Sequence, residues 1–371
     1  MKNIIFLILF TSIGALGQTI VKIDSGSING ARYRILFPPN WRWKLVMYAH
    51  GYEFNGSPLQ SQSPQFLKSM SPFLERGFAV AASDYQFQGL ALAQGVDDTE
   101  ALRRYFFDKY GKPDSTFMVG GSMGGGVTLA IMENYDTNYQ GALPLCPLSS
   151  RIYLQCRKEF DMYATFNGLF PGVVTPLSTI FDLKSPYQAQ DSRKMMAKAM
   201  DIKKAIMAKD SALALAFAKR FDLKLDDLPF SLFFNENVLR DIAQKAGGNP
   251  FDNTNTVYSG FPDNLLVNQK AERLAATVNP DVVFSKYDRS GNINKPVLLV
   301  HTIYDQLIPP TYGVVNFENM VHQKGKDQYF TVKYTKGQGH CAFSPQQIAL
   351  AFDELRNWTK TGVKAKAGFM E

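Results

Sequence analysis

The sequence predicts an α/β protein in which a mostly parallel, doubly wound sheet carries helices on both faces and receives one helical insertion. At both ends of the 371-residue chain, segments typical of strands alternate with segments typical of helices, and this alternation favours such a sheet. The middle of the chain, about 150–288, is rich in Ala, Lys, Met and Leu at helical spacing. A glycine-rich stretch around one serine joins a predicted strand to a predicted helix.

The predicted strands are apolar or β-branched segments bounded by Gly or Pro. They cover 31–38, 44–51, 76–85, 115–121, 139–147, 295–302 and 328–334. Helices outside the middle are predicted over 96–111, 124–134, 312–323 and 345–359. The first of these helices has acidic residues in its first turn and Gly at its end, as helices commonly do. Within the middle, 228–244 continues the helical periodicity.

The N-terminus has the pattern of a secretory signal peptide. Lys2 precedes the apolar run 4–10, and small residues stand at Ala15 and Gly17. The apolar run is shorter than the roughly 20 residues of a membrane span, so cleavage after Gly17 is favoured over a retained anchor. We therefore expect a secreted or periplasmic protein with no stable membrane span once residues 1–17 are removed.

The rest of the chain divides into a discontinuous core and its insertion. We expect the α/β core over 18–149 and 289–371 and the helical insertion over 150–288. The insertion leaves directly after a predicted strand, and sites in such sheets lie beyond the carboxyl ends of the strands. It is therefore predicted to be a cap over the site. The alternative is a separate helical domain with no part in the site.

The composition is that of an ordinary globular protein, with 45% apolar and 20% charged residues and a formal charge of +7. Removal of Lys2 with the leader lowers this charge from +7 to +6. The positive residues are scattered and no nucleic-acid-binding motif occurs, so no nucleic-acid partner is expected. The basic tail over 359–368 is expected to be a loose terminus.

One serine, Ser122, stands in the stretch Gly120-Gly121-Ser122-Met123-Gly124. The pattern Gly-x-Ser-x-Gly between a strand and a helix is typical of a sharp turn that lifts a serine hydroxyl above the sheet edge. Glycine two residues away on either side removes side chains that would collide there. A phosphate-binding loop is the alternative, but GxxxxGK[ST] is absent and no lysine lies nearby. Ser122 is therefore the predicted nucleophile.

A serine nucleophile needs a general base, and the chain has four histidines. His340 follows a late strand on a loop beside Gly339, and it is the predicted base. His50 lies at an earlier strand end, His301 within a strand as a packed side chain, and His322 on a helix surface.

The base in turn needs an acid that orients it. With this serine turn the chain order is Ser, acid, His, so the acid is expected after a late strand. Asp305 follows the strand over 295–302 and is the predicted acid. Asp84 lies too early in the chain, and we expect it to bond backbone groups at a strand end.

The oxyanion that forms during attack needs hydrogen-bond donors. The backbone N–H of Met123, at the start of the helix after the serine, is the first predicted donor. The N–H of Tyr52 is the second, because His50-Gly51 ends the strand over 44–51 on the neighbouring loop. An ordinary turn at the end of that strand is the alternative.

These stretches together resemble an exported member of the α/β-hydrolase superfamily. The resemblance is carried by "AHGY", "GFAVAASDY", "GGSMGGG", "GALPLC", "HTIYDQLIPP" and "GHCAF", which span most of 31–359 outside the insertion. "GGNPFDNTNTVYSG" and "GHCAF" are also similar to secreted bacterial proteins described only as hydrolases or peptidases. The resemblance implies the α/β-hydrolase fold and a Ser122, Asp305, His340 triad.

The chain has three cysteines, Cys146, Cys156 and Cys341, with no zinc-site spacing. An exported protein permits one disulfide among them, and the residues alone leave all three pairings open. The Cys beside the predicted histidine is similar to that of tannases and feruloyl esterases, in which it pairs with a Cys before the serine. Here that position is Gly121, and Cys146 ends the next strand, so the resemblance implies the pair Cys146–Cys341.

The sequence thus predicts a serine hydrolase that needs no metal and no cofactor. A carboxylic ester with an apolar acyl or aryl part is the expected small-molecule substrate, and a peptide is the second. A non-catalytic binding protein that kept the fold is the third. The aromatic runs over 166–172 and 228–234 are expected to pack as core or to line the substrate pocket.

Overall fold

The computed structural model describes residues 22–185 and 194–370. The predicted signal peptide, residues 1–17, lies outside the described residues. Within the described part of the chain, no helix is both long enough and apolar enough to cross a membrane.

A nine-stranded sheet forms the centre of the molecule, in the order β1-β2-β4-β3-β5-β6-β7-β8-β9. The first two strands pair antiparallel, β2 also runs antiparallel to β4, and all other neighbours are parallel. The strands are β1 (Lys22–Ile28), β2 (Ala31–Phe37), β3 (Lys44–Ala49), β4 (Phe78–Ser83), β5 (Ser115–Gly121), β6 (Gly141–Leu145), β7 (Val297–Tyr304), β8 (Phe330–Gln338) and β9 (Gly368–Phe369). The predicted mostly parallel sheet is confirmed.

The two outermost strands were not expected. β1 pairs with β2 through the two-residue loop Asn29-Gly30, in which both residues have positive φ, 51° and 90°. That geometry matches the twist of a hairpin and is the reason for the Asn-Gly pair. At the other edge, Gly368–Phe369 pairs with β8. The expectation of a loose tail is therefore wrong at its end, because backbone pairing with an edge strand holds Phe369 in place.

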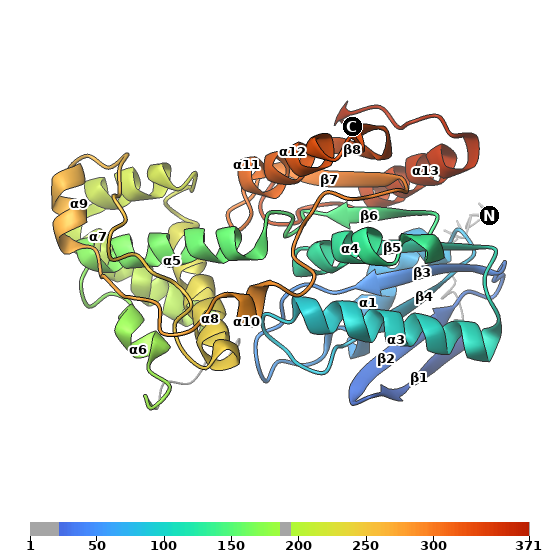
Figure 1. Cartoon of the computed structure of the whole chain (residues 1–371), viewed down its shortest axis with the longest axis horizontal. Helices are drawn as coiled ribbons and strands as arrows, with labels where there is room; N and C mark the ends of the chain where they lie inside the picture. The colour runs from blue at the N-terminus through green and yellow to red at the C-terminus, as the bar shows by residue number, and fades with distance from the viewer. Residues whose placement is uncertain (1–21, 186–193, 371) are drawn as a thin grey trace, which may run out of the picture.

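Helices cover both faces of the sheet (Figure 1). Those of the core are α1 (Pro64–Ser69), α2 (Ser71–Leu74), α3 (Leu92–Tyr110), α4 (Met123–Asn134), α11 (Pro310–Gly313), α12 (Val315–Gln323) and α13 (Pro345–Thr361). The helix predicted over 312–323 is two helices, α11 and α12, because Val314 breaks the run with φ −120° and ψ −59°.

Alternation along the strands divides the core into two layers, because successive strand residues point to opposite faces. In β3, Met47 packs with the layer of α3 and α4, which includes Phe106 and Val127. Its neighbour Val46 packs with the layer of α2 and α13, which includes Phe352. The sheet therefore has buried side chains on both faces.

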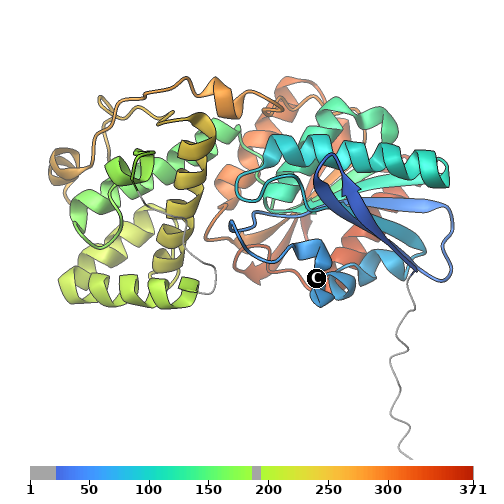
Figure 2. The ribbon, with the colours of Figure 1, turned by 90° about the horizontal axis from the view of Figure 1, so that it is seen from below.

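The insertion between β6 and β7 is helical, and both views show its helices gathered beyond one end of the sheet (Figure 1 and Figure 2). Its helices are α5 (Ile152–Leu169), α6 (Leu177–Phe181), α7 (Met195–Arg220), α8 (Leu228–Ala246), α9 (Asn264–Lys270) and α10 (Asp281–Phe284). Phe166, Phe217 and Phe233 are fully buried among them. The two ends of the insertion meet, because the N–H of Ile152 donates to Asp288 Oδ1 at 3.1 Å.

Candidate active site

Ser122 lies in a tight turn between β5 and α4. Its φ is 59° and its ψ is −125°, a region that residues with a side chain rarely occupy. A Cβ on Gly120 would lie 2.3 Å from the carbonyl oxygen of Gly124, and a Cβ on Gly124 would lie 2.1 Å from that of Ala49. Both distances are impossible contacts, so the turn requires glycine at both positions.

Ser122, His340 and Asp305 form a connected chain of hydrogen bonds. Nε2 of His340 lies 2.8 Å from Oγ of Ser122. Nδ1 of the same ring lies 2.8 Å from Oδ2 and 3.0 Å from Oδ1 of Asp305. When Nδ1 donates its proton to Asp305, Nε2 is left with the lone pair that can accept the serine proton.

Asp305 is held as a carboxylate just beyond β7. It is buried, and it accepts the N–H groups of Leu307 and Ile308 at 2.9 and 2.8 Å. Burial by itself raises the pKa of Asp305, but the hydrogen bond from His340, the charge of that ring and the N–H of Ile308 together hold the pKa below its ordinary value. The carboxylate is therefore charged at neutral pH and can fix the imidazole tautomer.

The other histidines lie away from the serine hydroxyl. His50 is buried and stacks on Tyr85 with ring centroids 3.9 Å apart. His301 is completely buried within β7. His322 is exposed on α12, with Nδ1 3.0 Å from Asp327. Each occupies the kind of place that the sequence predicts for it.

Asp84 bonds a neighbouring loop. It accepts the N–H of Ser61 at 3.0 Å, the hydroxyl of Ser61 at 2.6 Å and the amide of Gln62 at 3.1 Å. These contacts join the loop before α1 to the end of β4, which is the structural use expected for this carboxylate.

The positions predicted to supply the oxyanion donors border Ser122. Met123 is the first residue of α4, where N–H groups have no partner within the helix. The loop after β3 lies against the serine, since a Cβ on Gly51 would be 3.2 Å from Cβ and 3.7 Å from Oγ of Ser122. The hydroxyl of Tyr52 donates to Asp241 Oδ2 at 2.6 Å, which ties this loop to α8 of the insertion.

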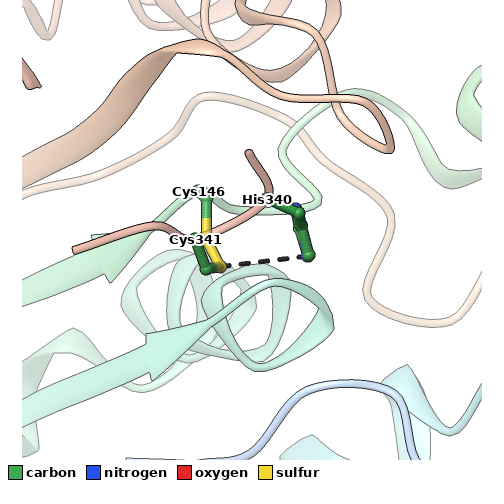
Figure 3. A group of neighbouring side chains, drawn as sticks. All are labelled: Cys146, His340 and Cys341. Atoms are coloured by element: carbon green, nitrogen blue, oxygen red, sulfur yellow. Dashed lines mark hydrogen bonds between the residues drawn. A yellow bond between two sulfur atoms is a disulfide. The ribbon is translucent and has the colours of Figure 1, made fainter. Parts of the chain in front are cut away.

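A disulfide joins Cys146 to Cys341, with Cα atoms 5.4 Å apart, and confirms the pairing that the family resemblance implies. The bond connects the end of β6 to the residue after His340, and Figure 3 shows the two sulfurs beside the imidazole. Sγ of Cys341 lies 3.8 Å from Nε2 of His340. The third cysteine, Cys156, is a buried free thiol.

Two groups of side chains of metal-ligating types occur within the described residues: Cys146, His340 and Cys341, and separately His50, Glu53 and Asp84. The sulfurs of the first group are bonded to each other, so they offer no thiolate. In the second group, Glu53 Oε1 already accepts the N–H of Gln60 at 2.8 Å.

A pocket of about 410 Å³ opens over Ser122 and His340. Its walls are mostly aromatic and apolar and come from both the core and the insertion: Tyr48, Phe54, Met70, Phe73, Phe230, Phe234, Leu307, Phe343 and Ile348. In the run 228–234, Phe230 and Phe234 face this pocket, whereas Phe233 is fully buried in the core. In 166–172, Phe166 and Phe170 are both buried in the core.

Two residues near the site could not be predicted as functional from the sequence. Asp241 of α8 accepts hydrogen bonds from Tyr52 and Asn55, and Glu159 of α5 lines a small pocket that Ser122 also lines. The available signal was that both are acidic residues on the buried side of predicted helices, which is unusual for Asp and Glu.

The mostly parallel sheet, the helices on both faces and the serine turn between β5 and α4 define the α/β-hydrolase fold.

No family model and no curated protein matches the sequence. Solved structures match it at low identity. An esterase of Pyrococcus furiosus is 15% identical with a TM-score of 0.48, over 91% of this chain and 90% of its own. Est1E from Butyrivibrio proteoclasticus is 14% identical with a TM-score of 0.44, over 91% and 98%. An acylaminoacyl peptidase of Pyrococcus horikoshii is 11% identical with a TM-score of 0.45, over 94% and 43%.

Proposed function

We propose that the chain is a serine hydrolase that cleaves carboxylic esters through an acyl-enzyme. The observation that carries the proposal is the unbroken hydrogen-bond chain from Asp305 through His340 to Oγ of Ser122, next to a pocket of about 410 Å³. Nucleophilic catalysis requires a nucleophile within hydrogen-bond distance of a general base, and an acid that orients the base.

In the first half-reaction, His340 takes the proton of Ser122 while Oγ attacks the ester carbonyl. The N–H groups of Met123 and Tyr52 stabilise the oxyanion. His340 then gives the proton to the leaving oxygen, and the acyl group remains on Ser122. In the second half-reaction His340 activates water, which attacks the acyl-enzyme and releases the acid.

The apolar and aromatic walls of the pocket support an ester with an apolar part as the substrate. Apolar surface that leaves water contributes roughly 25 cal/mol per Å², and Phe230 and Phe234 offer such surface beside the serine. We propose that residues 150–288 act as a cap, because α8 contributes these two side chains. An amide bond, as in a peptide, is the second candidate, since the acidic residue Glu159 lines a second pocket together with Ser122.

We also propose that the protein is exported. Residues 1–17 have the composition of a signal peptide, and the disulfide between Cys146 and Cys341 is the kind of bond that persists outside the cytoplasm. Cell fractionation of the expressed full chain, with N-terminal sequencing of the mature form, tests export. Retention in the cytoplasm with an intact leader would contradict it.

The enzymatic proposal is tested by kinetics of the Ser122→Ala variant on a panel of short and long acyl esters and aminoacyl amides. We expect a loss of about 10⁴-fold or more in turnover with the fold retained. Adding His340→Ala to this variant should cost little more, because members of a triad act as one unit. Hydrolysis at the wild-type rate by a folded Ser122→Ala protein would rule the nucleophile out.

A further inference from the structure

A second, smaller pocket borders Ser122 and is separate from the large one. Its volume is about 30 Å³, which is room for roughly two water-sized groups. The walls are apolar side chains, with Leu90, Leu148, Val238 and Ile308 among them. Glu159 supplies the charged group in this wall.

One oxygen of the Glu159 carboxylate is buried and has no hydrogen bond of good geometry within the described residues. Only 8% of the residue is exposed, and its Oε2 has no hydrogen-bond partner among the described residues. Gln155, one turn earlier on α5, is 1% exposed, and its amide makes no hydrogen bond of good geometry there. Buried polar atoms are nearly always paired, so an unpaired carboxylate oxygen on a residue that lines the same pocket as Ser122 indicates a missing partner.

The nearest positive charge does not fill that place. Lys158 is the preceding residue, and its Nζ lies 5.1 Å from the ring centroid of Tyr312. Burial raises the pKa of Glu159 to about 7, although Lys158 and Gln155 oppose this rise. A cation bound in the small pocket would lower this pKa again and so stabilise the ionised carboxylate of Glu159.

Glu159 is an acidic residue in a stripe of α5 that is otherwise mostly apolar, and packing alone does not explain an acidic residue there. The buried side of this helix carries Ile152, Cys156, Tyr163 and Phe166, which recur at helical spacing, and Glu159 falls in the same stripe. An apolar side chain would pack there at lower cost, because a buried unpaired charge is unfavourable.

The two pockets can be assigned to the two parts of a substrate. His340 borders the large pocket and not the small one. A general acid must reach the leaving group to protonate it, so the leaving group lies in the large pocket. The acyl group then lies on the other side of Ser122, in the small pocket with Glu159.

We infer that Glu159 binds the protonated amine of a small acyl group, so that the substrate is an ester or amide of a small amino acid with a free amino group. This inference rests on the proposed hydrolase function. The ammonium is carried by the carbon next to the scissile carbonyl, so its nitrogen lies two bonds from the carbon that Ser122 attacks. The pocket volume admits a small side chain such as methyl, and the apolar walls of the large pocket suit an apolar leaving group.

The test compares two nearly isosteric esters, L-alanine benzyl ester and benzyl isobutyrate, in which a methyl group replaces the ammonium. We expect wild-type kcat/KM to be at least about tenfold higher for the alanine ester, as a hydrogen bond to a charged group typically provides. In Glu159→Gln this ratio should fall about tenfold. The control is Asp161→Asn on the same helix, whose carboxylate instead bonds Arg157 and Tyr258, and it should keep the wild-type ratio.

A wild-type ratio of one or less would overturn the assignment without any variant, and so would an unchanged ratio in Glu159→Gln. Failure of the proposed function is distinguishable, because Ser122→Ala would then retain turnover of both esters. If Ser122→Ala is inactive on both esters while the wild type shows no preference, the hydrolase proposal stands and the amine site does not.

Discussion

At the scale of single residues, the site depends on a backbone that only glycine permits. Ser122 has a positive φ of 59°; such a conformation costs of order 1–3 kcal/mol and persists only where the surrounding structure holds it. The surroundings are backbone carbonyls: a Cβ on Gly124 would lie 2.1 Å from the oxygen of Ala49, and a Cβ on Gly120 would lie 2.3 Å from the oxygen of Gly124.

The glycines of the turn should therefore differ sharply in tolerance. Gly124→Ala would place Cβ 2.1 Å from the backbone oxygen of Ala49, whereas the nearest atom to a Cβ on Gly121 lies 3.8 Å away. We expect Gly124→Ala to lose about 3 kcal/mol or more of unfolding free energy, because a rigid backbone must move, and to lose hydrolysis. Gly121→Ala should change stability by less than about 1 kcal/mol. Denaturant unfolding measures both, and equal stabilities would contradict the account.

The two aspartates at strand ends offer a second comparison. Asp305→Asn removes the charge that fixes the tautomer of His340, and turnover should fall by about 10⁴-fold with the fold retained. Asp84→Asn alters only contacts to Ser61 and Gln62, so its effect should be on stability, about 1–3 kcal/mol. Steady-state kinetics of the folded variants checks this. Near-wild-type rates in Asp305→Asn together with an inactive, folded Asp84→Asn would show that the acid is misassigned.

The pKa of Asp305 also sets a pH dependence of stability. Its folded pKa lies below the ordinary value, so it contributes stability that is fully present above the unfolded pKa of about 4. That contribution is lost as pH falls through the lowered folded pKa. The difference in unfolding free energy between wild type and Asp305→Asn should therefore shrink as pH falls below about 4. A difference that grows on acidification would contradict the shift.

At the scale of elements, α8 links the insertion to the site on two sides. Asp241 on this helix accepts hydrogen bonds from Tyr52 at 2.6 Å and from Asn55, and it accepts the N–H of Leu90 at 3.3 Å. The same helix turns Phe230 and Phe234 toward the large pocket. One helix thus contacts both the loop predicted to hold the oxyanion and the space proposed for substrate.

Shortening the aromatic side chains of α8 should change selectivity before rate. Phe230→Ala with Phe234→Ala should lower kcat/KM for esters with a large apolar group by roughly tenfold, about 1.4 kcal/mol of lost burial. The rate on the smallest ester should change less. Phe233→Ala is the matched control, since Phe233 is fully buried; it should cost about 3–5 kcal/mol of stability without altering the preference. Equal losses on all esters from the double variant would argue against the cap.

At the scale of the whole molecule, the site joins parts of the chain that are far apart in sequence. Ser122, Asp305 and His340 come from three different strand ends, and the disulfide between Cys146 and Cys341 closes a separation of 195 residues. The bond holds the loop of His340 against the end of β6. Hydrogen bonds also hold this loop: the N–H of His340 donates to Gln306 at 2.8 Å, and the N–H of Gly339 donates to the carbonyl of Tyr304 at 2.9 Å.

Removing the disulfide should therefore affect both stability and chemistry. Cys341→Ala should lower the free energy of unfolding by about 2–5 kcal/mol and should reduce kcat, because the residue next to His340 loses its covalent bond to the end of β6. Cys146→Ala removes the same bond, so the double variant should be little worse than either single variant. Additive losses in unfolding free energy would show that the two cysteines act independently.

The sequence contains enough to predict the triad because each member follows a strand end and histidines are few. The hairpin of β1 was also available in the Asn29-Gly30 pair, but its strand alternates poorly and is largely exposed. Glu159 and Asp241 could not be assigned, because a helical segment shows which residues share a stripe but not which stripe meets the serine. That relation depends on how α5 and α8 pack against the core, which only the three-dimensional structure gives.

Whether Ser122 is the nucleophile is tested most directly by labelling the protein with a fluorophosphonate and identifying the modified residue by peptide mass spectrometry. We expect one adduct per chain, on the peptide that contains Ser122, formed in step with loss of ester hydrolysis and absent from Ser122→Ala. An adduct on another residue, or full loss of activity without modification of Ser122, would contradict it.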